Sequence, residues 1–149
     1  MARIKAHRLE HAAGMLLVGY VLLLLLLTLA PPHYVPPQRL RLMPFATIMQ
    51  QLGKGGVVFL VNVPGNMVAF APLGMLVPLC AARLRSLIRI LLVGAVISLG
   101  VELLQLGFTE RVADIDDVLL NVVGTALGYG SYQLYADWSA RQRPHNQDA

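Results

Sequence analysis

Charged residues and cysteine are both scarce in this chain. Only 13% of its 149 residues are Asp, Glu, Lys or Arg, whereas about 25% is usual in a soluble globular domain. Hydrophobic residues make up 56%, so the composition indicates one domain whose solvent is lipid. Cys80 is the only cysteine, and an internal disulfide is therefore excluded.

The local motifs of common hydrolases and metalloenzymes are missing as well. The chain contains no H-E-x-x-H, C-x-x-C or G-x-S-x-G sequence. Its histidines share no metal-ligand spacing; they are His7, His11, His33 and His145. The net charge of +4 does not indicate nucleic-acid binding, because the basic residues stand beside apolar runs, where they set membrane topology. We therefore predict no cofactor, no resident metal and no nucleic-acid partner.

Long apolar runs are what the chain has in abundance. Residues 12–30 carry no charge and come close to the ~20 residues that a helix needs to cross the hydrocarbon core. Three further runs, at about 57–81, 87–108 and 117–136, predict three more crossings. The sequence thus predicts an all-α bundle of four transmembrane helices over 12–136. A basic cytoplasmic segment over 1–11 precedes the bundle, and a polar cytoplasmic tail over 137–149 follows it.

A cleaved signal peptide is the alternative for the first run. Thr28-Leu29-Ala30 resembles a small-residue cleavage site. The run is longer than the ~7–15 apolar residues of a signal peptide, however, and Pro31 would follow the cut. An uncleaved first transmembrane helix is favoured.

Proline and glycine punctuate the next part of the chain. After Pro44, apolar residues recur at helical spacing and predict a short helix over 44–52 on the membrane surface, namely Phe45, Ile48, Met49 and Leu52. We interpret the following Gly53-Lys54-Gly55-Gly56 as a flexible turn, because the full phosphate-loop pattern is absent. Within the second crossing, Pro64, Pro72 and Pro78 predict a kinked or broken helix.

Lys and Arg residues predict the orientation of the four crossings. One side, with both termini and the 83–89 loop, carries eight of them: Arg3, Lys5, Arg8, Arg83, Arg85, Arg89, Arg141 and Arg143. The other side carries four: Arg39, Arg41, Lys54 and Arg111. The positive-inside rule then predicts a multi-pass protein of a bacterial-type cytoplasmic membrane, with both termini in the cytoplasm.

Polar and small residues form one stripe on each of the last two crossings. Ser98, Glu102 and Gln105 recur at i, i+4 and i+7 and share a helix face. The second stripe is formed by Asp114, Asp117, Asn121, Gly124 and Gly128. A short turn makes the two helices antiparallel neighbours, so the stripes can meet, and the G-x-x-x-G step lets a partner helix approach closely.

The depth of these groups predicts a site that opens to the outer surface. At ~1.5 Å per residue, Glu102 lies ~9 Å below the outer helix end and Asn121 ~6 Å. An intramembrane carboxyl is a functional-site candidate, although a buried structural pair is the alternative. The candidate catalytic residues are Glu102, Gln105 and Arg111. The candidate substrate-binding residues are Asn62, Asn66, Asp114, Asp117 and Asn121. For Asp114 and Asp117 the alternatives are pairing with Arg111, capping the fourth helix, or holding Mg²⁺ or Ca²⁺.

From Met43 to about Tyr129 the chain resembles the VanZ-like family, membrane proteins named for one linked to teicoplanin resistance. The matching pieces, in order, are Pro44-Phe45-x-x-Ile48, Asn62-x-x-x-Asn66-x-x-x-Phe70-x-Pro72-Leu73-Gly74-x-x-x-Pro78, Ser98-x-x-x-Glu102-x-x-Gln105, Arg111-x-x-Asp114-x-x-Asp117-Val118 and Asn121-x-x-Gly124-x-x-x-Gly128-Tyr129. The family often has Asn shortly before the Pro-Phe pair, where this chain has Arg41. The resemblance implies a small polytopic membrane fold and a link to glycopeptide or envelope stress, without supplying a reaction.

Two functions are consistent with these features. The first is a site that binds or modifies the head group of a membrane lipid or a lipid-linked envelope precursor, in connection with glycopeptide (teicoplanin) or envelope stress tolerance. The alternative is a non-catalytic interaction or scaffold module whose polar residues join helices. A site predicts an open polar cavity around Glu102, whereas a scaffold predicts polar groups that satisfy one another.

Overall fold

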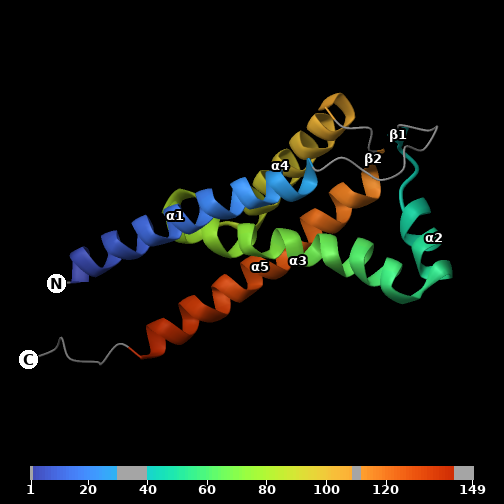
Figure 1. Ribbon diagram of the computed structural model, residues 1–149. Coiled ribbons are helices and arrows are strands. Elements are labelled where there is room, and N and C mark those ends of the chain that lie inside the picture. Colours follow the sequence, from blue (N-terminus) through green and yellow to red (C-terminus); the bar gives the residue numbers. More distant parts are fainter. Residues whose placement is uncertain (1, 30–39, 109–111, 143–149) are drawn as a thin grey trace, which may run out of the picture.

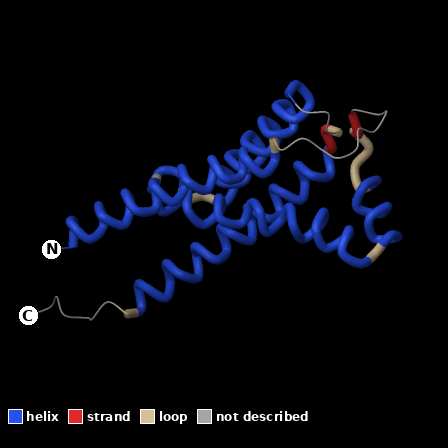
Figure 2. Tube along the Cα trace, in the orientation of Figure 1, coloured by secondary structure: helices blue, strands red, loops and turns tan. Residues whose placement is uncertain are grey.

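The structure, a computed structural model, describes residues 2–29, 40–108 and 112–142. The chain is almost entirely helical (Figure 2), which confirms the predicted all-α class. The elements, in order, are α1 (Ala2–Thr28), β1 (Leu40–Arg41), α2 (Ala46–Lys54), α3 (Gly56–Cys80), the 3₁₀ turn η1 (Ala82–Leu84), α4 (Leu87–Phe108), β2 (Ala113–Asp114) and α5 (Ile115–Arg141).

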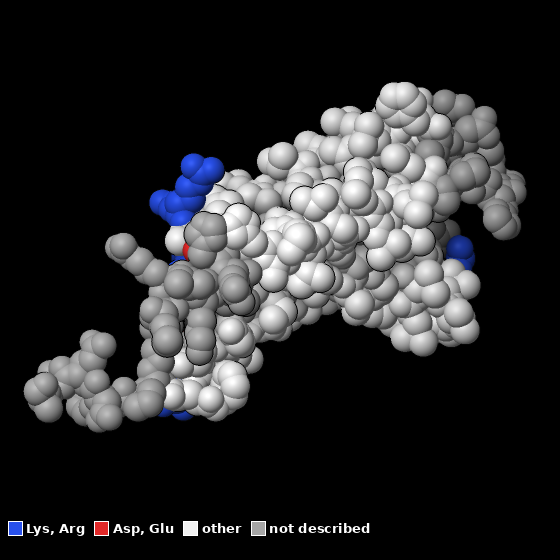
Figure 3. Space-filling view, turned by 60° about the vertical axis from the view of Figure 1, so that its left-hand side comes forward, with Lys and Arg blue, Asp and Glu red and all other residues white. Residues whose placement is uncertain are grey.

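Within the described residues, three helices are long and apolar enough to cross a membrane. The qualifying segments are Glu10–Thr28, Gly56–Cys80 and Leu87–Phe108. The fourth predicted crossing falls in α5, which has 27 residues but is not among these three, so the count of four stays a prediction. On the described surface visible in Figure 3, Lys and Arg lie towards the two ends and the middle is uncharged. Large apolar side chains such as Leu26, Val68 and Val96 are at least 70% exposed, as expected where lipid replaces water.

The long helices run back and forth between two ends of the bundle (Figure 1). The start of α1 and the end of α5 lie at one end. The opposite end holds α2, the two strands, the end of α4 and the start of α5, and is called the α2 end below. There α2 lies across the direction of the bundle, which is the arrangement expected of a surface helix.

The proline-containing helix α3 is continuous. Pro64, Pro72 and Pro78 all lie inside the single helix Gly56–Cys80, so the predicted break is absent and the kink is not confirmed. Each proline removes one backbone donor and leaves a carbonyl without its helical partner. Near the helix end, Arg85 Nε donates a hydrogen bond of 3.0 Å to the Pro78 carbonyl. This bond satisfies one of the last carbonyls of α3, which have no partner within the helix.

The closest helix contact in the bundle is the crossing of α3 and α5. A Cβ atom on Gly124 or Gly128 would overlap the backbone of Met67 or Ala71. A Cβ atom on Gly74 would overlap the backbone of Thr125 in the same way. We call Gly74, Gly124 and Gly128 the glycine seam. The stripe prediction paired these α5 glycines with the neighbouring helix α4, and that was wrong, because both face α3.

Around the seam lies the apolar core. Its buried members come from α1, α3, α4 and α5: Leu24, Phe70, Leu73, Val77, Ile90, Val101, Tyr129 and Tyr132. Because α3 supplies three of these and touches α1, α2, α4 and α5, it is the central helix of the fold.

Candidate functional site

Glu102 and Asp114 form the junction between α4 and α5. The Glu102 Oε2 atom accepts a hydrogen bond of 2.9 Å from the Asp114 backbone N–H. Asp114 is the N-cap of α5, and its Oδ1 accepts from the Asp116 backbone N–H at 3.0 Å. The two residues are only 5% and 6% exposed. The capping alternative for Asp114 is therefore the one observed, and Glu102 holds the capping residue in place.

Asp116 joins α5 to the start of α2. Its carboxylate is fully buried and accepts hydrogen bonds from the backbone N–H groups of Phe45, Thr47 and Ile48, at 2.6, 2.8 and 3.0 Å. The first amides of a helix have no partner within the helix, and a carboxylate there is also favoured by the helix dipole. Asp116 thus caps α2 from another helix.

The sequence analysis missed Asp116, although a signal was available. Phe45 is the N-cap residue of α2, lies in the left-handed region at φ 65° and has no side chain that can cap a helix. A helix start without Ser, Thr, Asp or Asn needs an acceptor from elsewhere. The acidic turn contains three aspartates, and the helical stripe used only two of them.

Asp114 also connects the strands to α2. Strands β1 and β2 pair in parallel, with Leu40 opposite Ala113 and Arg41 opposite Asp114. The Thr47 hydroxyl donates to Asp114 Oδ2, and Arg41 Nη1 lies 4.0 Å from the same oxygen. The segment before α2 is therefore attached to the start of α5 through both backbone and side chains.

Amide side chains join the remaining helices near the same end. Asn66 on α3 donates to Asp117 Oδ1 at 2.7 Å. Asn121 on α5 donates to Ser98 Oγ on α4 at 2.8 Å, so this part of the two predicted stripes does meet. Gln105 on α4 donates to the Thr28 carbonyl at the end of α1, at 2.9 Å.

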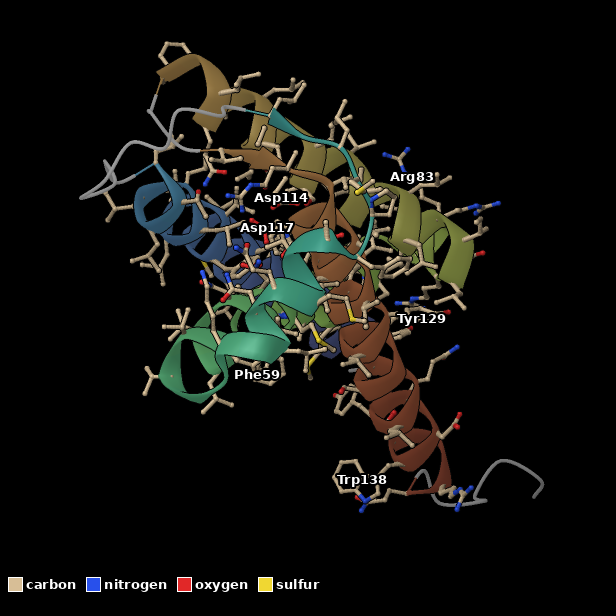
Figure 4. The ribbon with its side chains drawn as sticks, turned by 90° about the vertical axis from the view of Figure 1, so that its right-hand side faces the viewer. Phe59, Arg83, Asp114, Asp117, Tyr129 and Trp138 are labelled. Carbon is tan, nitrogen blue, oxygen red and sulfur yellow. The ribbon has the colours of Figure 1, made fainter. Side chains whose placement is uncertain are left out.

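The structure thus places most of the predicted site residues at or near one end of the bundle. Figure 4 shows Asp114 and Asp117 close together beside α2, far from Trp138 at the other end of α5. Asn62 is half-buried on α3, one turn before Asn66. Arg111 lies outside the described residues. Among those that are described, no group of three or more His, Cys, Asp or Glu is arranged to hold a metal ion.

Two buried acceptors have no hydrogen-bond partner among the described residues. They are Asn121 Oδ1 and Gln51 Oε1, on side chains that are 5% and 8% exposed. Of the other polar side chains described above, some bond to one another and the rest bond to backbone groups.

A groove of about 540 Å³ opens between β1 and α2, beside this polar network. Its wall carries one cation, one hydroxyl and one amide: Arg41, Thr47 and Gln50. The rest of the lining is Leu42, Met43 and Ala46. The Arg41 side chain is 36% exposed, so it is accessible from the groove while it remains near Asp114.

Comparison with known proteins places the chain in a family. The sequence profile of the VanZ/LLP1 family matches residues 17–136. The chain belongs to the VanZ/LLP1 family. The resemblance seen in the sequence is thereby confirmed. The matched region contains all the hydrogen-bonding residues described above, from Thr28 to Asn121. No curated protein and no solved structure matches the chain.

Proposed function

We propose that this VanZ/LLP1 membrane protein binds the polar head group of a membrane lipid or of a lipid-linked cell-envelope precursor at its α2 end. In this proposal, binding links the protein to glycopeptide (teicoplanin) or envelope stress tolerance. The observation that carries the proposal is the groove between β1 and α2, which lies directly over a buried polar network. Polar groups are expensive inside a membrane, so their concentration at one end favours a function there.

The contacts support binding more strongly than catalysis. Glu102 Oε2 accepts from a backbone amide, and the Gln105 amide donates to a backbone carbonyl. Both residues therefore act in our proposal as positioning residues that hold α4, α5 and α1 together beneath the groove. Asn66, Asp114 and Asp117 act likewise, and they fix the wall of the groove relative to the bundle.

A non-catalytic scaffold is the second candidate, and one observation favours it. Some polar side chains at the α2 end pair with one another across helices, as expected of groups that join helices. A scaffold of this kind would stabilise the bundle without any ligand. The two candidates differ in whether the groove is occupied.

Filling the groove separates the two candidates. Ala46 lines the groove, and Ala46→Trp should abolish both the co-purification of lipid by the full chain and any teicoplanin tolerance it confers. The melting temperature in detergent should stay nearly unchanged, because Ala46 is exposed. Ala140→Trp, also exposed and at the far end of α5, is the matched control. Full lipid retention and full tolerance in Ala46→Trp would favour the scaffold.

The orientation belongs to the same proposal. We place the α2 end outside the cytoplasm, as the Lys and Arg asymmetry predicts, with the start of α1 and the end of α5 together on the other side. In a Cys80→Ser background, an impermeant thiol reagent added to cells should modify Met49→Cys and spare Arg83→Cys. The reverse labelling pattern would invert the orientation.

A further inference from the structure

The groove between β1 and α2 offers one full positive charge to a ligand. Among the described residues that line it, Arg41 is the only Lys or Arg. A guanidinium forms charge-assisted and often bidentate hydrogen bonds with phosphate oxygens, and it is more weakly hydrated than an ammonium group. The charge of the groove therefore fits an anion, and its planar donor set fits a phosphate.

The nearby acidic residues leave the Arg41 guanidinium able to donate hydrogen bonds to a ligand. Arg41 Nη1 lies 4.0 Å from Asp114 Oδ2, which is beyond hydrogen-bond distance. The same Asp114 oxygen already accepts from the Thr47 hydroxyl, and Asp114 is only 6% exposed. The Asp116 carboxylate is fully buried against the amides of α2. That carboxylate already accepts from the first backbone amides of α2. An anion in the groove therefore makes its ionic contact with Arg41.

The rim of the groove is apolar, which indicates that the phosphate belongs to a lipid. Leu42 and Met43 line the groove and are 65% and 75% exposed. Phe45 and Met49, which neighbour lining residues of α2 along the chain, are 61% and 67% exposed. At the end of a transmembrane bundle, such side chains lie at the boundary between head groups and acyl chains. A ligand that meets both Arg41 and this rim has a charged head and an apolar body.

We infer that the groove holds the phosphate of an anionic phospholipid, with Arg41 as its ionic partner and Met43, Phe45 and Met49 against its acyl chains. The inference rests on the proposed function and narrows it from any polar head group to a phosphate-bearing one. Gln50 supplies a neutral amide on the same wall. The phosphate thus lies between β1 and α2, outside the buried network.

The test is lipid retention by the full chain, measured by native mass spectrometry. The protein is exposed in detergent to equal amounts of phosphatidylglycerol and of an uncharged glucosyl diacylglycerol. The wild-type chain should retain phosphatidylglycerol preferentially. Arg41→Gln should reduce that preference by about tenfold, which is the effect of losing one hydrogen bond to a charged group. Lys54→Gln, at the other end of α2 and outside the groove, is the control and should keep the preference.

Each outcome decides a separate question. Equal retention of both lipids by the wild-type chain would overturn the phosphate assignment and leave the proposed head-group site standing. No retention of either lipid would contradict the proposed function itself. If millimolar inorganic phosphate displaced the phospholipid, the lipid source would be wrong. Should Arg41→Gln fail to fold, Arg41→Lys, which keeps the charge and loses the planar fork, should show a weaker preference than the wild type; an unchanged preference would count against Arg41.

Discussion

At the glycine seam, α3 and α5 meet through backbone atoms, whereas at the α2 end separate segments meet through carboxylates and amides. The seam has no room for a single Cβ atom at Gly124 or Gly128. The α2 end, in contrast, has a groove of about 540 Å³ and two buried oxygens that have no hydrogen-bond partner in the described part of the chain. The two regions are only a few helical turns apart on α5.

In our proposal, this difference separates the part of the bundle that provides stability from the part that binds a ligand. Lipid gives helices no hydrophobic reason to associate, so close packing at small residues has to provide much of the attraction. The seam meets this need at the middle of the fold. The α2 end is then able to contain polar groups in less dense packing, which is the condition that a binding site requires.

The largest effect is expected at the seam. Gly128→Leu should prevent α3 and α5 from approaching, and little or no folded protein should be recovered from membranes, because the clash is with the backbone of Ala71 and no side chain can move aside. Gly130→Ala is the matched control, since a Cβ atom there meets nothing within 4 Å. Size-exclusion profiles in detergent measure both variants. Normal recovery of Gly128→Leu would show that the crossing tolerates separation.

An intermediate effect is expected for the cap of α2. Asp116→Ala leaves the backbone amides of Phe45, Thr47 and Ile48 without their acceptor, and hydrogen bonds to a charged group are worth about 1.5–3 kcal/mol. Hydrogen exchange should accelerate throughout α2 while α3 keeps its protection. The exposed Asp137→Ala should change neither region. Equal acceleration in α2 and α3 would mean that the two regions unfold as one unit.

The smallest effect is expected for Glu102→Gln. The glutamine side chain keeps the shape of the glutamate and one oxygen that can accept from the Asp114 amide. The free energy of unfolding should therefore fall by only about 1 kcal/mol. Lipid retention and drug tolerance should survive, because we assign Glu102 a positioning role. Loss of tolerance in a fully stable Glu102→Gln protein would instead support acid–base chemistry at this carboxyl.

Much of the fold followed from local pattern. The surface helix predicted over 44–52 is found at Ala46–Lys54, and the third crossing predicted over 87–108 coincides with α4. A kinked or broken second crossing was predicted from Pro64, Pro72 and Pro78; α3 is one continuous helix, so there is no break, and the kink is not confirmed. Convergence of Glu102 and Asp114 was predicted from the two facing stripes and from their depth, although their direct hydrogen bond was not.

The sequence by itself determined the membrane environment, the helical class and the family. The length of apolar runs, helical periodicity and motif spacing are all local properties of the sequence. Only the tertiary structure decided which neighbour each face meets. Periodicity places Asn121, Gly124 and Gly128 on one side of α5, yet Asn121 bonds to α4 and the glycines contact α3. The tertiary structure also revealed Asp116 as the cap of α2. A helix face is wide enough to contact two partner helices. A capping carboxylate that lies about 70 residues away along the chain leaves no signal in the local sequence.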